Sequence, residues 1–157
     1  MCGRGARQAR GAGITVGLIL DSTVLIAAER KLFELAAFLE SEAPTEPVFT
    51  TVVTASELWH GVERADHEAR RVKRRAFVEA VIEATPVLSF DLACARQHAQ
   101  LWARLEGKGE RIGAHDMLIA AICLRFGHRL ATLNTAEFRR VEGLELVETR
   151  GFVRGEI

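Results

Sequence analysis

The sequence predicts an α/β domain whose central, mainly parallel sheet is flanked by helices on both faces, an α/β/α sandwich. Two observations predict this class. Short apolar or β-branched segments alternate along the chain with longer segments of helical periodicity, as in parallel sheets built from crossover units. The chain has 157 residues and is 48% hydrophobic, which is enough for one compact core and too little for two independent domains.

The first half of the chain predicts two strands and three helices. Residues 14–20 form a short β-branched run that ends at an acid. Apolar residues then recur at helical spacing between Val24 and Leu39, which predicts one helix. After the breaker EAPTEP, residues 48–53 predict the second strand. TASELWHGVERA reads as a helix start, and a charged stretch leads into a further helix near residues 77–82.

The second half repeats the alternation. Asp91 is placed to cap a helix, and Gly127 is placed to end the most apolar helix of the chain. The expected elements are a strand at 86–90, a helix at 92–105, a Gly-rich loop at 106–113, a helix at 115–126, a strand at 130–133 and an edge strand at 144–147.

The ends of the chain are expected to lie outside the domain. We predict a flexible N-terminal tail at 1–13, the folded domain at 14–150 and a C-terminal tail at 151–157. The basic tail followed by ITVGLIL superficially resembles a secretory signal, but Asp21 interrupts the apolar run after about seven residues. No run reaches the roughly 18 apolar residues of a membrane span. We therefore expect a cytoplasmic protein.

Charge and cysteine content exclude some classes of site. The 21 basic and 21 acidic residues give a formal net charge of zero, so any basic surface must be local. The three cysteines are widely spaced and form no CxxC pair, which indicates reduced thiols and neither a disulfide framework nor a zinc site.

Polar residues gather where the predicted strands end. Asp21 ends the first strand, Glu57 follows the second, Asp116 opens the apolar helix, and Asn134 follows the fourth. Each has an ordinary structural explanation: Glu57 completes a T-x-x-E capping box with Thr54, Asp116 suits a helix start, and Asn134 suits a turn. Capping also explains Asp91, and Glu137 suits a solvated acid.

Taken together, the three carboxylates favour a metal site. Ligands of parallel sheets bind at the carboxyl ends of the strands, where these residues should meet. Carboxylates about 5 Å apart repel by roughly 3 kcal/mol per pair at an effective dielectric near 20. A cation or protons must offset that repulsion. Oxygen ligands select hard ions, so we expect Mg²⁺, with Mn²⁺ as a substitute.

Three blocks of the sequence carry a resemblance to a known family. They are LILDSTVLIA, TASELWHGVERA and RIGAHDMLIAAICLRFGHRLATLNTAEFRRVEGLELV, in this order from Leu18 to Val147. The last block is the most specific, with a Gly before the acid, an apolar helix of small residues and a T-x-N-x-x-x-F turn. The chain resembles the PIN-domain ribonucleases, and within them the VapC-type toxins of bacterial toxin–antitoxin pairs.

The resemblance implies roles for individual residues. Asp21, Glu57 and Asp116 match the metal-binding acids, and Asn134 matches the fourth polar position, often Asp in the family. Glu137 follows as an additional acid. Thr132, and Ser22 or Thr23, match positions whose hydroxyl orients acids or water. The Asn leaves open whether a second metal binds.

The implied function is that of a Mg²⁺-dependent endoribonuclease toxin, in which an activated water cleaves an RNA phosphodiester. Transfer RNA or ribosomal RNA is the implied substrate, a VapB-type antitoxin the implied partner, and a homodimer the expected assembly. Two alternatives stay open, an RNA-processing nuclease outside toxin–antitoxin systems and a non-catalytic module that binds RNA or protein. A haloacid-dehalogenase-type phosphatase is disfavoured, because Thr23 stands where its second acid is needed.

Other polar and aromatic residues are assigned more ordinary roles. The basic cluster from Arg64 to Arg75 suits a solvated helix face, or else a rim that contacts RNA phosphates. His115 adjoins Asp116, but a cap or surface position is the favoured interpretation. Trp59 and Trp102 suit core or subunit-interface anchors.

Overall fold

A four-stranded parallel sheet lies at the centre of the molecule. The computed structural model describes residues 15–155. The strands lie in the order β3-β2-β1-β4, and every neighbouring pair is parallel. Their bounds are Leu18–Leu20 for β1, Val48–Thr51 for β2, Val87–Leu88 for β3 and Arg129–Ala131 for β4. The predicted fold class, an α/β domain built on a parallel sheet, is confirmed.

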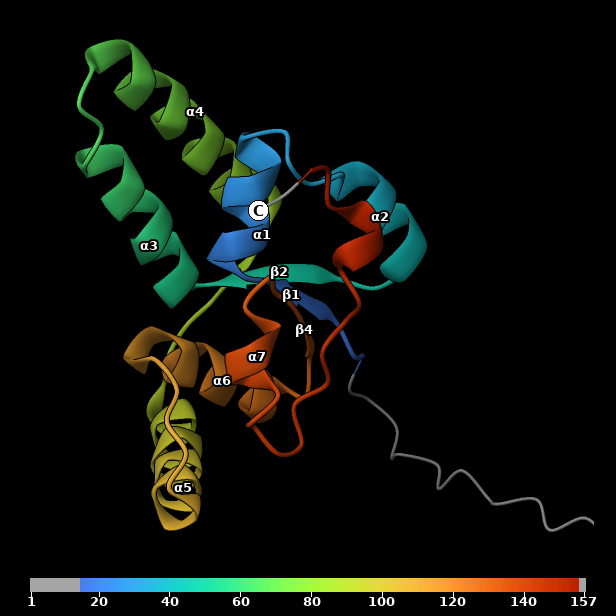
Figure 1. The fold of residues 1–157 in the computed structure, drawn as a ribbon, viewed down its shortest axis with the longest axis vertical. Coiled ribbons are helices and arrows are strands. Elements are labelled where there is room, and N and C mark those ends of the chain that lie inside the picture. The colour runs from blue at the N-terminus through green and yellow to red at the C-terminus, as the bar shows by residue number, and fades with distance from the viewer. Residues whose placement is uncertain (1–14, 156–157) are drawn as a thin grey trace, which may run out of the picture.

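Helices cover both faces of the sheet. In Figure 1, α1 to α4 lie on one side of it, and α5 and α6 lie on the other. Their bounds are Ser22–Glu29 (α1), Leu35–Glu42 (α2), Val52–Glu63 (α3), Glu68–Ala84 (α4), Leu92–Lys108 (α5), Ala114–Phe126 (α6) and Thr135–Phe138 (α7), followed by a 3₁₀ helix, η1, at Arg150–Phe152. Within residues 15–155, none of these helices combines the length and the apolar character needed to span a bilayer.

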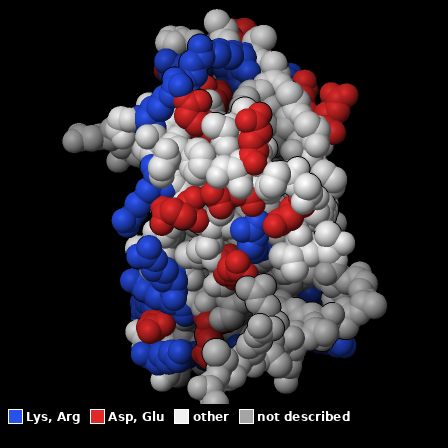
Figure 2. Space-filling model, turned by 90° about the vertical axis from the view of Figure 1, so that its right-hand side faces the viewer, with Lys and Arg blue, Asp and Glu red and all other residues white. Residues whose placement is uncertain are grey.

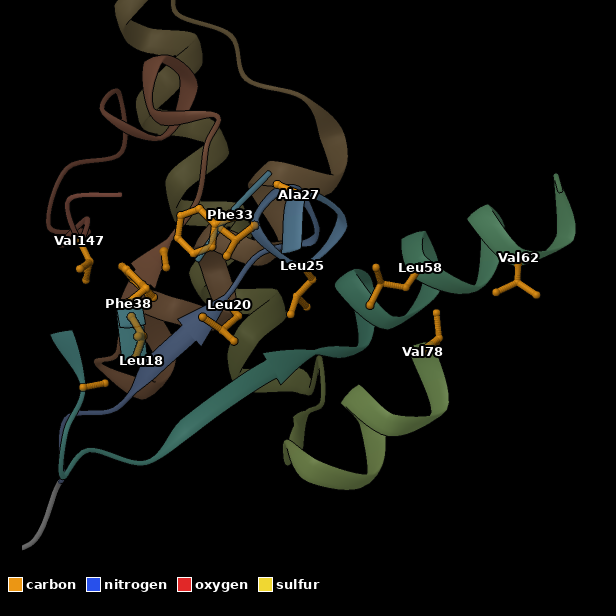
Figure 3. Close-up of a cluster of buried hydrophobic side chains, with 13 residues drawn as sticks. Leu18, Leu20, Leu25, Ala27, Phe33, Phe38, Leu58, Val62, Val78 and Val147 are labelled. Atoms are coloured by element: carbon orange, nitrogen blue, oxygen red, sulfur yellow. The ribbon is translucent and has the colours of Figure 1, made fainter. Parts of the chain in front are cut away.

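Alternation along β1 divides the core into two clusters. Successive side chains of a strand point to opposite faces, so Leu18 and Leu20 face the layer of α1 to α4, whereas Ile19 faces α5 and α6. Figure 3 shows the first cluster, in which Phe38 of α2 lies beside Leu18 of the strand, and Leu58 of α3 faces Val78 of α4. All three β1 side chains are buried. Burial of this strand on both faces fixes the position of the next residue, Asp21, at the carboxyl edge of the sheet.

The single helix expected between Val24 and Leu39 is wrong, because the chain forms two helices there. α1 ends in a left-handed turn at Lys31, whose φ is 60°. The amide of Leu32 donates to the carbonyl of Ala27 (2.8 Å), and the amide of Lys31 donates to that of Ala28 (3.0 Å). This is the Schellman arrangement, which usually has glycine at the left-handed position. With Lys at that position, the sequence carries no signal for the helix end.

Later elements follow the expectations with shifted boundaries. Asp91 caps α5 as predicted, its Oδ1 accepting from the amide of Cys94 at 2.8 Å. Gly127, with a φ of 67°, ends α6 as predicted. The expected strand at 144–147 is reduced to an isolated bridge between Leu146 and Leu130.

The C-terminal segment packs on the domain beyond the expected boundary at residue 150. Phe152 forms an edge contact with Phe38, with ring centroids 5.2 Å apart, and Val153 bridges Phe33. The expected tail at 151–157 therefore starts too early, because these apolar side chains cover α2. The predicted N-terminal tail, 1–13, lies outside the described residues.

Candidate metal-binding active site

Asp21 lies at the junction of β1 and α1, where it is held by three hydrogen bonds. It is the N-cap of α1, and its Oδ1 accepts from the amide of Ser22 at 2.8 Å. Its Oδ2 accepts from the hydroxyl of Thr132 at 2.7 Å and from that of Thr23 at 2.8 Å. These donors explain how an acid that is only 1% exposed is accommodated inside an apolar run.

The site nevertheless disfavours the charge of Asp21. Burial raises the pKa of this carboxyl above its usual value, while the hydrogen bonds from Thr132, Thr23 and Ser22 lower it, and the charge of Glu57 raises it further. Desolvation is the largest of these causes, so the protein places a carboxylate where water solvates it poorly.

Asp116 lies in the first turn of α6 and belongs to the same electrostatic group. Burial raises its pKa to about 6, with further contributions from the charge of Asp21 and from Glu137. Its Oδ2 accepts from the side-chain amide of Asn134 at 2.7 Å, which lowers the pKa. Glu137 is itself held by the amide of Gly113, at 2.7 Å. Asp116 makes no capping bond to α6, whose cap position is Gly113.

Glu57 approaches this group from α3, but not as a capping residue. The cap of α3 is Thr51, whose hydroxyl accepts from the amide of Thr54 at 3.1 Å. The predicted capping box with Thr54 is therefore wrong, because the helix begins at Val52 and Glu57 lies in its second turn. Glu57 Oε1 lies 3.1 Å from His115 Nδ1, and Oε2 is buried without a hydrogen-bond partner.

The structure thus brings the predicted residues to one edge of the sheet, where pairs of them interact through charge or through hydrogen bonds. Asp21 affects Asp116, Asp116 interacts with Asn134 and Glu137, and Glu57 affects Asp21. As the side chains stand, no three His, Cys, Asp or Glu groups within residues 15–155 are close enough together to hold one metal ion. The full coordination shell expected from the sequence is not assembled by side chains alone.

The donor chemistry fits a hard divalent cation. All the candidate ligands are oxygens, which Mg²⁺ and Mn²⁺ prefer. Within the described part of the chain, neither Asp21 nor Asp116 has a Lys or Arg ion-pair partner. Mg²⁺ usually keeps several waters and takes one or two carboxylates, so a site for it does not require three protein carboxylates.

Sequence reasoning identified the hydroxyls but underestimated His115. Thr132 and Thr23 both donate to Asp21 as expected, whereas Ser22 contributes its backbone amide. His115 is neither a cap nor an isolated surface residue, because its ring contacts Glu57. Its position directly before Asp116, in the first turn of a helix at the site, was the available signal.

A groove adjoins the site on the side of α1, α3 and α4. It has a volume of about 320 Å³, and Glu57 lies on its wall together with Arg30, Arg64 and Arg74. Arg74 is fixed there, its guanidinium donating to the carbonyl of Gly61 at 3.0 Å. Arg30 and Arg64 are exposed and form no ion pair within residues 15–155.

Other members of the predicted basic cluster make local pairs. Arg70 pairs with Asp66 at 2.6 Å, and Arg71 lies 3.8 Å from Glu68. On the face drawn in Figure 2, basic side chains gather along the left edge and over the top, and a band of acidic side chains crosses the middle, with single charges of the opposite sign among both. A net charge of zero therefore coexists with local concentrations of one charge.

Comparison with known proteins identifies the family to which this sequence belongs. Residues 18–144 match the model of the PIN domain. Ribonuclease VapC1 of Rickettsia felis is 35% identical over 133 residues, covering 84% of this chain and 96% of that protein. The tRNA(fMet)-specific endonuclease VapC of Shigella flexneri is 35% identical over 92 residues, covering 59% of this chain and 67% of that protein.

Solved structures agree with the sequence matches. DNA-bound VapBC from Salmonella typhimurium superposes with a TM-score of 0.75 at 25% identity, covering 84% of this chain and 97% of that one. VapBC-5 from Mycobacterium tuberculosis, described as a member of the VapBC family of toxin-antitoxin systems, superposes with a TM-score of 0.68 at 29% identity, covering 85% and 98%. The chain belongs to the PIN-domain family and, within it, to the VapC-type toxins.

Proposed function

We propose that this protein is a metal-dependent endoribonuclease that acts as the toxin of a toxin–antitoxin pair. The observation that carries the proposal is the pair of acids at the carboxyl edge of the sheet: Asp21, held by Thr132 and Thr23, and Asp116, whose pKa is raised by burial and by the charge of Asp21. Neither acid has a Lys or Arg ion-pair partner in the described chain. A site that gathers negative charge without neutralising it is suited to a divalent cation. The curated VapC relatives, which are ribonucleases, supply the reaction class.

Each residue of the site has a definite task in this proposal. Asp21 and Asp116 would hold the cation, and Glu57 would complete its surroundings directly or through water. Thr23 and Thr132 keep Asp21 in one orientation, so its oxygens do not have to reorganise during the reaction. When bound, Mg²⁺ or Mn²⁺ would supply positive charge at the phosphodiester and lower the pKa of an attacking water.

Asn134 has a different task from that of a fourth acid. Its side-chain amide donates to Asp116 at 2.7 Å, which stabilises the carboxylate form of that acid. The amide thereby orients a ligand and adds no negative charge of its own. Glu137, held by the amide of Gly113, remains available as the additional acid on this side of the site.

The partners follow from the family. Solved relatives are VapBC complexes, so we infer that a VapB-type antitoxin restrains this chain. A relative named a tRNA(fMet)-specific endonuclease makes transfer RNA a first substrate to test, with ribosomal RNA as the second. A cytoplasmic location follows from these partners. A homodimer stays a prediction, and the half-exposed Trp102 on α5 is a candidate anchor for it.

Removal of the metal is the direct test of this function. Protein purified free of antitoxin is expected to cleave transfer or ribosomal RNA with Mg²⁺ or Mn²⁺, and to stop when a chelator is added. Cleavage products resolved on a denaturing gel are the measurement. Cutting that continues unchanged in the chelator contradicts the metal-dependent mechanism.

RNA binding measured beside cleavage tests one remaining alternative, and the neighbouring gene together with a growth assay tests the other. RNA that is bound but never cut under any metal condition favours a non-catalytic module. Cleavage by a protein that has no co-transcribed antitoxin and does not arrest growth favours an RNA-processing nuclease.

The groove beside Glu57 predicts a path for the RNA backbone. Replacing both Arg30 and Arg64 by Ala is expected to weaken RNA binding, because two cations that can contact phosphates are removed. Each lost phosphate contact should lower the slope of log affinity against log salt by about 0.7. Filter binding across a salt series, with Asp21→Asn added to prevent cleavage, measures both effects.

Arg96 provides the matched control for this experiment. It is an exposed arginine on α5, on the other side of the sheet. Its replacement by Ala should leave the salt slope close to that of the parent protein. Equal losses from the Arg96 and groove variants would mean that overall charge, not the groove, controls binding.

A further inference from the structure

His115 connects the two helices that carry the outer acids of the site. Its Nδ1 lies 3.1 Å from Glu57 Oε1, joining the first turn of α6 to the second turn of α3. It directly precedes Asp116 in the chain. His115 and Asp116, a proposed metal ligand, are therefore held by the same turn of α6.

The contact leaves the two oxygens of Glu57 in different environments, one bonded to His115 and one without a partner. An ionised carboxylate accepts hydrogen bonds and does not donate them, so the ring donates through Nδ1–H. The contact lies near the surface, since the His115 side chain is 61% exposed and that of Glu57 is 25% exposed. The other oxygen, Oε2, is buried and has no hydrogen-bond partner within the described residues.

A buried carboxylate oxygen without a partner is costly, and an orphaned group of this kind requires an explanation. A single hydrogen bond contributes little to folding stability, so His115 is not needed there to hold α3 and α6 together. His115, which bonds the other oxygen, directly precedes Asp116 at the start of α6, so Glu57 lies beside the helical turn that carries a proposed metal ligand. The unsatisfied oxygen and this position together point to a ligand absent from the protein alone.

We propose that His115 is a positioning residue for Glu57: by binding Oε1 it leaves Oε2 free to face a cation held by Asp21 and Asp116. The inference rests on the proposed metal-dependent function. Glutamate has three freely rotating side-chain bonds, and the ring contact selects one arrangement of them before the metal arrives. Residues that orient metal ligands in this way typically change metal affinity 10- to 100-fold when they are lost.

Two substitutions separate the hydrogen bond from the bulk of the ring. His115→Phe keeps a flat ring and removes the donor, whereas His115→Asn can place an amide nitrogen close to the position of Nδ1. With Mn²⁺ alone as the titrant and no RNA present, calorimetry should show about 10-fold weaker binding for His115→Phe. His115→Asn should bind Mn²⁺ close to the wild-type affinity.

Further measurements identify the route of the effect. In cleavage assays, the Mn²⁺ concentration for half-maximal rate should rise by the same factor for His115→Phe, with an unchanged KM for RNA at saturating metal. In a Glu57→Gln background, His115→Phe should cause no further loss of Mn²⁺ affinity, because the two residues act as one unit. The melting temperature without metal should be similar for wild type and both His115 variants.

The opposing results are equally definite. Unchanged or tighter Mn²⁺ binding by His115→Phe overturns the proposal, tighter binding meaning that His115 holds Glu57 away from the metal. A changed KM for RNA with unchanged Mn²⁺ affinity also overturns it, since the ring would then contact substrate. A wild-type protein that neither binds Mn²⁺ nor cleaves RNA contradicts the proposed function itself, whereas an active wild type insensitive to His115 contradicts this inference alone.

Discussion

Asp21→Asn is expected to reduce metal-dependent RNA cleavage by on the order of 10³-fold, about 4 kcal/mol of transition-state stabilisation. Asp21 is the most buried of the proposed ligands, and its orientation is fixed by Thr132 and Thr23. The amide has nearly the same shape but carries no charge to anchor the cation. Single-turnover cleavage at saturating metal and RNA measures the loss.

The same variant is expected to fold normally. Asn caps a helix as well as Asp, so its oxygen can keep the bond from Ser22. The two threonine hydroxyls each accept one backbone amide, from Leu133 and Asn134, and each retains a lone pair for the new amide group. The pKa of Asp21 is raised by burial, so removal of the charge should not lower the melting temperature.

Asp91→Asn is the matched control, because Asp91 is also an N-cap that accepts a backbone amide, at the start of α5. This replacement keeps the cap and lies outside the acid group. Cleavage should stay at the wild-type rate, which would leave Asp91 with a structural role only. If Asp21→Asn cuts RNA as fast as wild type, Asp21 is not a metal ligand for catalysis.

Asp116→Asn is expected to stabilise the metal-free protein above pH 6 while abolishing cleavage. Burial and the neighbouring charge of Asp21 raise the pKa of Asp116 to about 6 in the folded protein, against an ordinary value of 3.8. The folded state therefore binds a proton more tightly than the unfolded chain does. Stability from this group is fully present below about pH 4 and is lost as the pH rises through about 6.

The sign of the effect can be checked by thermal unfolding across pH. Wild-type protein without metal should lose several degrees of melting temperature between pH 4 and pH 7, and Asp116→Asn should lose distinctly less. Asn can still accept from Asn134 and can donate to Glu137, so no hydrogen bond need be given up. Mg²⁺ should raise the melting temperature of wild type above pH 6 and have a smaller effect on the variant.

An exposed acid far from this group provides the reference. Asp66→Asn, between α3 and α4, should leave the pH dependence of the melting temperature unchanged. A large fall in melting temperature for Asp116→Asn at every pH would contradict the electrostatic interpretation. It would show instead that the carboxylate supports the start of α6.

Local sequence patterns predicted most of the elements and misplaced those boundaries that depend on particular contacts. Asp91 and Gly127 were recognised because capping acids and C-terminal glycines act within one turn of the helix. The end of α1 was missed because Lys31 adopts a left-handed conformation with none of the residues that usually do so. The C-terminal boundary was missed because Phe152 and Phe38 meet across a long sequence separation.

In the candidate site too, the sequence predicted some features, and others depended on the folded chain. Asp21, Glu57 and Asp116 were chosen from the sequence because each follows or opens an element at one edge of the expected sheet, and their motifs match a family. That they share one metal remains a prediction. The capping box at Thr54 was wrong because α3 begins earlier, at Val52, so that Thr51 is the cap. A shift of three residues changed the role assigned to Glu57.

By itself, the sequence determined the fold class, most of the elements and the choice of candidate acids. The elements follow from periodicity, a property of neighbouring residues, and the acids from their places after predicted strands and from the order of motifs along the chain. Only the tertiary structure decided that Thr132 and Thr23 donate to Asp21, that Asn134 donates to Asp116 and that His115 contacts Glu57. Those contacts join residues on different elements, and a hydrogen bond depends on separations of a few tenths of an ångström that only the packed chain can set.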